Sequence, residues 1–216
     1  MTTLAESFLS RQEQDRITAT VQQVEKNTSG EIVPMIVSRS DDYPMTTITG
    51  SISLGVPPAI LLTIIIGNHI WIGPQNMWLF LLLATTICTV LSFPISKSDR
   101  IKTFFLNRKQ VEKEVQKSAL AAFYQERLYK TRDNNGILLY ISVLEKKVWI
   151  LADTSINEKI DQEEWDNIIA ELTATLKDGD RCEAICRAIQ QIGNILASHF
   201  PYKKDDTDEL HNLIIR

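Results

Sequence analysis

The chain has 216 residues, of which 23 are Lys or Arg and 27 are Asp or Glu, so its formal net charge at pH 7 is -4. This acidic balance offers no basic surface of the kind that binds nucleic acid, and no nucleic-acid partner is predicted. Three Cys are too few for a disulfide framework and are typical of a protein in a reducing compartment.

The first predicted elements are a helix over residues 9–26 and a strand over residues 31–38. Ser10 followed by Glu13 matches a capping box, in which each residue satisfies a backbone N–H of the other. Gly30 ends the helical pattern, and the residues after it are rich in β-branched side chains. One helix and one strand cannot bury a core, so their partners are expected further along the chain.

Residues 43–96 contain no Lys, Arg, Asp or Glu, although charged residues make up 23% of the chain. The stretch is long enough for two membrane spans, because one span needs roughly 20 apolar residues. We predict spans over residues 48–66 and 77–95, joined by a turn over residues 67–76 that is rich in Gly, Asn and Pro. The lipid bilayer is therefore a predicted partner, and the two spans are predicted to form a transmembrane hairpin.

Basic residues near the two spans predict which way the hairpin faces, since Lys and Arg are retained on the cytoplasmic side. Arg39 precedes the first span, and Lys97, Arg100 and Lys102 follow the second, whereas the connecting turn has no basic residue. We expect a protein of the cytoplasmic (inner) membrane with both termini in the cytoplasm. No signal peptide is recognised at the start, and the absence of ionisable residues in the spans argues against a channel or transporter.

Beyond the hairpin, the pattern predicts more helices and strands with short connections. Apolar runs separated by a polar turn indicate a β-hairpin, and near-continuous apolar character indicates strands covered on both faces. The predicted elements are a long helix over residues 99–130, strands over 137–144 and 148–152, helices over 162–177 and 181–199, and an extended charged tail.

These elements predict one α/β domain that is interrupted by the membrane hairpin. Its first part is residues 1–42, the hairpin is residues 43–96, the second part is residues 97–200, and residues 201–216 form the charged C-terminal tail. About 160 residues lie outside the spans, which suits a single domain. We expect an α/β/α sandwich with a small mixed sheet, in which the strand after Gly30 pairs with the strands beyond the hairpin.

Hard oxygen donors in loops make a site for calcium or magnesium the strongest chemical candidate. The central group is the loop before Gly136, and the same residues are also ordinary turn formers, so turn chemistry alone is the competing interpretation. Two further acidic positions are candidates to converge with it. The predicted metal ligands are Asp133, Asn134, Asp153, Asp178 and Asp180.

Other side-chain chemistry is less promising. Cys182 and Cys186 are four residues apart on a predicted helix, which puts both thiols on one face and favours a buried apolar role. No Ser-His or Cys-His nucleophile motif, phosphate loop or dinucleotide-binding glycine motif is recognised.

The chain resembles the TPM domain family, and within it the bacterial membrane proteins whose domain is split by a two-helix hairpin. The matching segments are SGEIVPMIV, DNNGILLYISVLEKKVWILADTSINEKI, the helix with Trp165, GDRCEAICRAIQQIGNILASHFP and DELHNLIIR. The resemblance implies an α/β/α sandwich, and it maps the family's acidic cluster onto Asp133 and Asn134. Some members are described as acid phosphatases or calcium-binding proteins, and others as factors that maintain membrane complexes.

Two departures from the family pattern argue against transferring catalytic activity. Asp153 lies in a segment where many members are glycine-rich, and Glu183 follows Gly179 and Asp180 where glycines are common. We therefore predict a membrane-anchored, non-enzymatic factor that binds or helps assemble a membrane protein complex. The alternative is a phosphatase that depends on a divalent metal, with Ca²⁺ or Mg²⁺ as cofactor.

Overall fold

The structure is a computed structural model that describes all residues except 1–2, 70–76, 99–101, 103 and 203–209. Most of the predicted turn of the hairpin and part of the predicted tail lie outside the described residues. The chain divides into two compact units. We call them the α/β unit, Met1–Asp41 with Glu112–Arg216, and the hairpin unit, Asp42–Val111.

The α/β unit is built on a mixed four-stranded sheet of order β3-β2-β1-β4. Its strands are β1 (Glu31–Val37), β2 (Gly136–Ser142), β3 (Lys147–Ala152) and β4 (Ile214–Ile215). Strand β1 pairs in parallel with β2 and with β4, and β2 pairs antiparallel with β3. The predicted pairing of the first strand with the strand beyond the hairpin is confirmed, from Glu31 opposite Gly136 to Val37 opposite Ser142.

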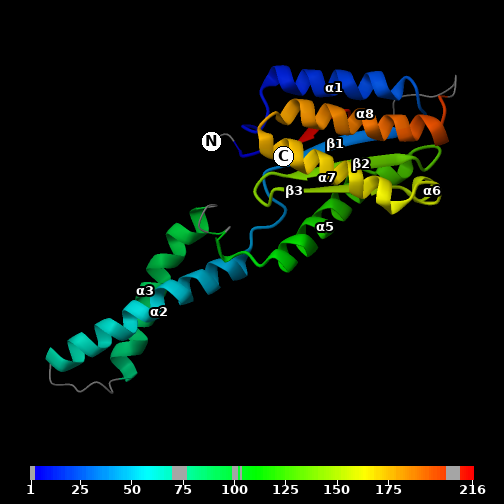
Figure 1. Ribbon diagram of the computed structural model, residues 1–216. Coiled ribbons are helices and arrows are strands. Elements are labelled where there is room, and N and C mark those ends of the chain that lie inside the picture. Colours follow the sequence, from blue (N-terminus) through cyan, green and yellow to red (C-terminus); the bar gives the residue numbers. More distant parts are fainter. Residues whose placement is uncertain (1–2, 70–76, 99–101, 103, 203–209) are drawn as a thin grey trace. The chain divides into compact units, whose positions relative to one another are not determined.

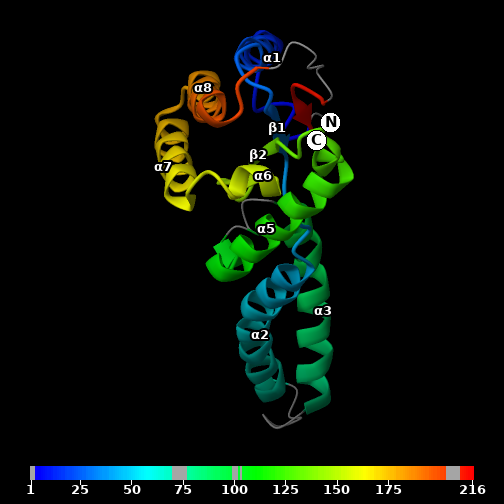
Figure 2. The same cartoon turned by 90° about the vertical axis from the view of Figure 1, so that its right-hand side faces the viewer.

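Helices lie in layers on the sheet, which confirms the predicted sandwich. Helices α1 (Arg11–Glu25), α7 (Gln162–Asp178) and α8 (Arg181–His199) run alongside one another (Figure 1), and α7 and α8 lie on one side of the strands in Figure 2. Short helix α6 (Thr154–Asn157) connects β3 to α7. Their apolar faces share one core with Ile32, Ile36 and Leu139 of the central strands.

Helix α5 (Arg108–Gln125) contributes buried residues Val115, Ala119 and Phe123. Ser118 on this helix lies 2.8 Å, Oγ to Oη, from Tyr140 of β2, whose side chain is on the opposite sheet face from Leu139. A 3₁₀ turn, η1 (Leu128–Lys130), leads from α5 towards β2. Both faces of the central strands are therefore covered, and every residue of β1 and β2 is buried.

The predicted long helix over residues 99–130 is wrong in its extent, because α5 begins only at Arg108. The side chain of Asn107 accepts a hydrogen bond from the N–H of Lys109, at 3.1 Å, and its carbonyl accepts from Val111, at 3.0 Å. This is the geometry of an N-cap, which starts a new helix rather than continuing an old one.

The C-terminal segment was expected to be extended and charged, and the described part of it adds a strand that the sequence analysis missed. Even-numbered residues of β1 direct their backbone groups towards β4, as the bonds from Arg216 N to Ile36 O (2.9 Å) and from Ser38 N to Arg216 O (2.7 Å) show. Pro34 points the same way and has no N–H to donate. Pairing with β4 is accordingly confined to Met35 and Ile36. The N–H of Ile32, which has no partner in β4, donates to the carboxylate of Glu25, at 3.0 Å.

The hairpin unit contains the helices α2 (Pro44–His69) and α3 (Met77–Lys97). Both are long and apolar enough to cross a membrane. Helix α2 continues through Gly67 and Asn68, so the turn begins later than predicted. Within this unit, Phe105 lies 3.3 Å from the position of a Cβ built on Gly50, and the Lys102 Nζ donates to the Asp42 carbonyl, at 3.3 Å.

Candidate functional site

The predicted loop over residues 131–136 folds as a tight turn in front of β2. The carbonyl of Thr131 accepts from the N–H of Asn134 (3.1 Å), and the Thr131 hydroxyl accepts from the N–H of Asn135 (3.0 Å). Asn134 has φ 51, a left-handed conformation that Asn adopts more readily than most residues. A Cβ on Gly136 would lie 2.5 Å from the carbonyl oxygen of Leu128, so this position requires glycine.

The same loop is fixed to the start of β1 by a buried amide. Asn135 is 3% exposed, and its Nδ2 donates to the carbonyl of Ser29, just before the strand. Its own carbonyl accepts from the N–H of Glu31, at 3.2 Å. Asn135 of the loop thus aligns the parallel strands β1 and β2. This structural role of Asn135 was not predicted from the sequence.

Asp153 follows β3 and lies beside this loop. Its N–H donates to the carbonyl of Gly136 (3.0 Å), and its carboxylate Oδ1 accepts from the N–H of Thr154 (2.6 Å) as the cap of α6. The Ser155 hydroxyl donates to the carbonyl of Asp133, at 3.1 Å, which joins the two segments. The second carboxylate oxygen of Asp153 is buried and accepts no hydrogen bond from the described residues. The structure therefore brings the Asp133 and Asp153 segments together, as predicted.

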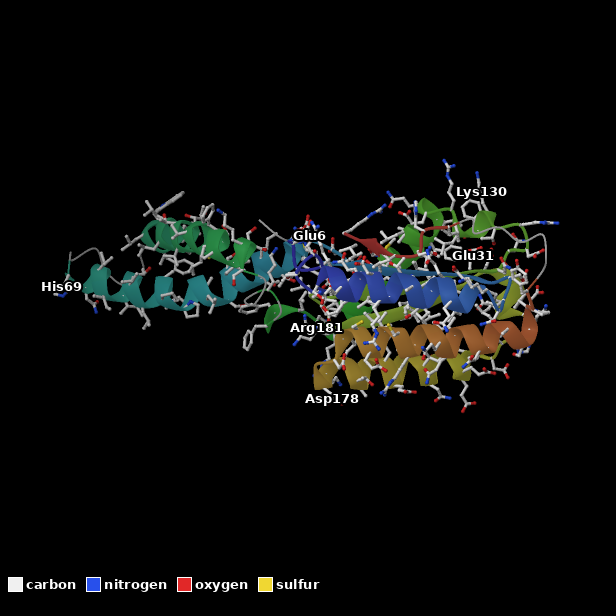
Figure 3. The ribbon with its side chains drawn as sticks, turned by 90° about the horizontal axis from the view of Figure 1, so that it is seen from above. Glu6, Glu31, His69, Lys130, Asp178 and Arg181 are labelled. Atoms are coloured by element: carbon white, nitrogen blue, oxygen red, sulfur yellow. The ribbon has the colours of Figure 1, made fainter. Side chains whose placement is uncertain are left out.

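Asp178 and Asp180 do not join this group. Asp178 is the last residue of α7, and Asp180 caps α8 by accepting from the N–H of Glu183, at 3.2 Å. Helix α7 starts near Asp153 and its 17 residues carry the chain about 25 Å away. In Figure 3, Asp178 lies at the opposite end of the α/β unit from Glu31. The expectation that these two acids converge with the loop is not met, because α7 separates them from it.

The loop therefore has a limited donor set for a metal ion. Among the described residues no group of three or more His, Cys, Asp and Glu side chains is placed to hold a metal. Calcium takes six to eight oxygen ligands, which include backbone carbonyls and water as well as carboxylates. Asp153 Oδ2 has no hydrogen-bond donor among the described residues and belongs to the segment joined to Asp133, whereas Asp178 and Asp180 lie at and beyond the far end of α7.

The paired thiols of α8 are part of the core, as predicted. Cys182 and Cys186 are 3% and 4% exposed and belong to the same apolar cluster as Ile17 and Val21 of α1. Burial raises the pKa of the Cys182 thiol to about 11, and the neighbouring Cys186 adds to this rise. A thiol with a raised pKa stays protonated at neutral pH, which makes it a poor nucleophile and a poor metal ligand.

A cleft of about 540 Å³ lies at the end of the α/β unit opposite the loop. Four of its lining residues are basic: Lys146, Lys147, Lys177 and Arg181. These residues were not predicted from the sequence, since they come from the β2–β3 connection, the start of β3 and two different helix ends. No spacing in the sequence brings such residues together, and only the tertiary structure does.

Comparisons with known proteins give a family match over part of the chain and a similar fold. The family model described as "TPM domain" matches residues 96–195. A similar solved structure is the NMR structure of BA42 protein from the psychrophilic bacterium Bizionia argentinensis, with 22% sequence identity and a TM-score of 0.60 over 99% of this chain and 98% of that chain. At this identity the likeness shows the fold alone. No curated protein matches the chain.

Proposed function

Residues 96–195 match the model of the TPM domain family, and we propose that this chain is a membrane-anchored, non-enzymatic binding protein of that family. In this proposal the α/β unit works at the cytoplasmic surface of the membrane, where it helps to assemble or maintain a membrane protein complex. The hairpin unit is the anchor, and both termini lie in the cytoplasm.

The observation that carries this proposal is the direction in which the hairpin unit places its side chains. The buried positions of α2 are all small or hydroxyl-bearing: Thr46, Gly50, Ser51, Gly55, Ala59, Thr63 and Gly67. Large apolar side chains on the same helix are exposed, among them Leu61 (62%) and Ile65 (54%). Small residues between closely packed helices and large apolar residues facing outwards are typical of helices surrounded by lipid.

The topology supports a role at the membrane surface. Strands β1 and β2 are neighbours in the sheet, yet the whole hairpin unit lies between them in the sequence. Six residues, 38–43, connect the end of β1 to the start of α2. An anchor inserted in this way holds the α/β unit through two chain connections, and a domain held at a membrane meets other membrane proteins more often than diffusing substrates.

Site-specific crosslinking in cells tests the binding role. A photoreactive amino acid placed at Leu61 or Trp78, both exposed on the hairpin, is expected to capture the same membrane protein from both positions. The same amino acid at Leu120, exposed on α5, reports on partners of the α/β unit. Failure to capture any membrane protein from the three positions under several growth conditions would contradict the proposal.

The membrane orientation is tested by fusion reporters. A fluorescent protein that folds only in the cytoplasm should be active after residue 216 and before residue 1. A reporter active only outside the cytoplasm should work when inserted between α2 and α3. The reverse pattern would show that the hairpin faces the other way.

A metal-dependent phosphatase is the second candidate, favoured by the buried Asp153 Oδ2 beside the Asp133 loop. Ca²⁺, Mg²⁺ or Mn²⁺ should then accelerate hydrolysis of a phosphomonoester by the purified chain. The variant Asp153→Asn should abolish that gain, because Asn still caps α6 but carries no charge. Asp161→Asn is the matched control, since Asp161 is exposed and its side chain makes no capping bond. A metal that leaves both hydrolysis and the melting temperature unchanged would rule out this candidate.

A further inference from the structure

The cleft at the end of the α/β unit combines an apolar floor with a basic rim. Its volume of about 540 Å³ falls in the range of sites that bind small organic molecules. The floor is lined by apolar side chains that include Phe8, Ile141, Val148 and Leu176. None of the lining residues is acidic.

The basic residues reach the rim from separate elements of the α/β unit. Lys146 lies in the turn between β2 and β3, with φ 53, and Lys177 lies in the last turn of α7. Arg181 begins α8, and its guanidinium donates to the carbonyl of Phe8 (3.0 Å) with its central carbon 4.6 Å from the centre of the Phe8 ring. These contacts orient Arg181 and leave further N–H donors of its guanidinium for a ligand.

Acids near this rim pair with it weakly or are held by other groups. Hydrogen bonds with Ser10 are the main cause that lowers the pKa of Glu13, and the charge of Arg181 is a smaller one. Lys147 pairs with Glu112 at 3.7 Å, but both side chains are about half exposed, and such surface pairs are weak. Asp180, which precedes Arg181, is engaged as the cap of α8. Glu145, which precedes Lys146, accepts from the N–H of Ser40 at 2.9 Å and from the hydroxyl of Ser142.

We infer that this cleft binds an amphiphilic organic phosphate, with the phosphate at the Lys146, Lys177 and Arg181 rim and an apolar body on the floor. Several cations converging from different elements suit a group with more than one charge and several acceptor oxygens, and Arg is well matched to phosphate. An apolar floor contributes binding energy only to a ligand that has a hydrophobic part. The ligand comes either from the bilayer, as a lipid with a phosphate headgroup, or from solution.

The binding test uses the full chain in nanodiscs of zwitterionic lipid and a soluble probe, dihexanoyl phosphatidic acid, measured by calorimetry. The double variant Lys146→Gln/Lys177→Gln should weaken binding by about tenfold, from the loss of two charge contacts. The matched control is Lys26→Gln/Lys130→Gln, which removes the same charge at exposed positions of the α/β unit; in Figure 3 Lys130 lies at the opposite end from Arg181. The control should bind the probe as the parent chain does.

Glycerol 3-phosphate, which has no apolar body, tests the floor and should bind more weakly than the dihexanoyl probe. The inference is overturned if the probe does not bind, if both double variants weaken binding equally, or if glycerol 3-phosphate binds as tightly as the probe. These outcomes are separate from the proposed role in complex assembly, because the probe binds to the cleft and the assembly test reports on protein partners.

A photoreactive phosphatidic acid incorporated into the nanodisc distinguishes the two sources of the ligand. If it labels the peptide that contains Lys177, and Lys146→Gln/Lys177→Gln reduces the labelling, the ligand is a bilayer lipid. If only the soluble probe reaches the cleft, the ligand is a soluble phosphate ester. Either result supports the cleft as the binding site.

Discussion

The α/β unit and the hairpin unit place their large apolar side chains in opposite directions. In the α/β unit, Leu139 and Ile189 are fully buried and the exposed helix faces carry charge. In the hairpin unit, Leu61 and Leu82 are more than 60% exposed, whereas Gly55 and Ala59 are buried. The first arrangement suits water as solvent and the second suits hydrocarbon. The α/β unit thus buries large apolar side chains, whereas the hairpin unit buries small residues and exposes the large apolar ones.

The largest expected effect on stability comes from a substitution in the core of the α/β unit. Leu139→Ala should lower the free energy of unfolding by about 2–5 kcal/mol, because it removes buried methyl groups and leaves a cavity. Urea unfolding of the full chain in detergent, followed by Trp fluorescence, measures this change. Leu61→Ala is the matched control on the hairpin, and an equal loss from both variants would contradict the contrast between the units.

A charge introduced on the hairpin tests whether its exposed apolar side chains lie in lipid. Leu61→Arg should oppose membrane insertion by about 2.5–3.5 kcal/mol, the cost of a basic residue near the centre of a span. The fraction of chain retained in membranes after alkaline extraction measures insertion. Leu120→Arg, at an exposed position of α5, should leave that fraction unchanged. Equal retention of the Leu61 variant and the parent chain would argue that α2 does not lie in lipid.

The inside of the hairpin is expected to tolerate no added volume. A Cβ on Gly55 would lie 2.7 Å from the sulfur of Cys88 and 3.3 Å from its backbone nitrogen. Gly55→Leu should therefore destabilise the packing of α2 on α3 by about 1–3 kcal/mol, as overpacking does. Unfolding by dodecyl sulfate in mixed micelles, followed by circular dichroism, measures the loss. Leu54→Phe adds volume at an exposed neighbour and should have little effect.

The smallest expected effect concerns a charged cluster on the water-exposed side of the α/β unit. Hydrogen bonds from Arg187 and Arg16 lower the pKa of Glu183 below the ordinary value of 4.5. Because the folded pKa is the lower one, this contribution to stability is present above pH 4.5 and is lost as the pH falls through the folded pKa. Glu183→Gln should reduce the melting temperature slightly at pH 7, and this reduction should shrink as the pH is lowered below 4.5.

The control for this last change is Glu158→Gln, which alters an exposed carboxylate. Added salt should shrink the difference between Glu183→Gln and the parent chain, because exposed charges are screened. A difference that shrinks neither with falling pH nor with added salt would show that Glu183 acts by packing rather than by charge.

Local signals predicted most of the fold. The capping box of Ser10 and Glu13 is present with both of its bonds, and the last long helix begins at Arg181 and ends at His199 as its pattern indicated. These features depend on residues close in sequence, which is why a single sequence reveals them. Strand β4 was missed because two residues, Ile214 and Ile215, are too few to show a period.

The candidate site was only partly predictable, for a related reason. Asp133 and Asp153 meet because both border the paired ends of β2 and β3, and the β-hairpin was recognisable in the sequence. Asp178 and Asp180 share the residue type of this group, but the 17 residues of α7 keep them away from it. The cleft with Lys146 and Arg181 depends on the packing of three distant segments, and no local pattern encodes it.

The position of the hairpin between β1 and β2 also fixes an order of events during synthesis. Gly136 is 105 positions after its partner Glu31, and Ile214 is 179 positions after Met35. At 5–20 residues per second, β1 waits about 5–20 seconds for its first neighbour. Both helices of the hairpin leave the ribosome during that interval. The α/β unit therefore completes its sheet only on a chain whose two hairpin helices have already been made. In the proposed membrane-anchored role, insertion of the hairpin can thus begin before the sheet is complete.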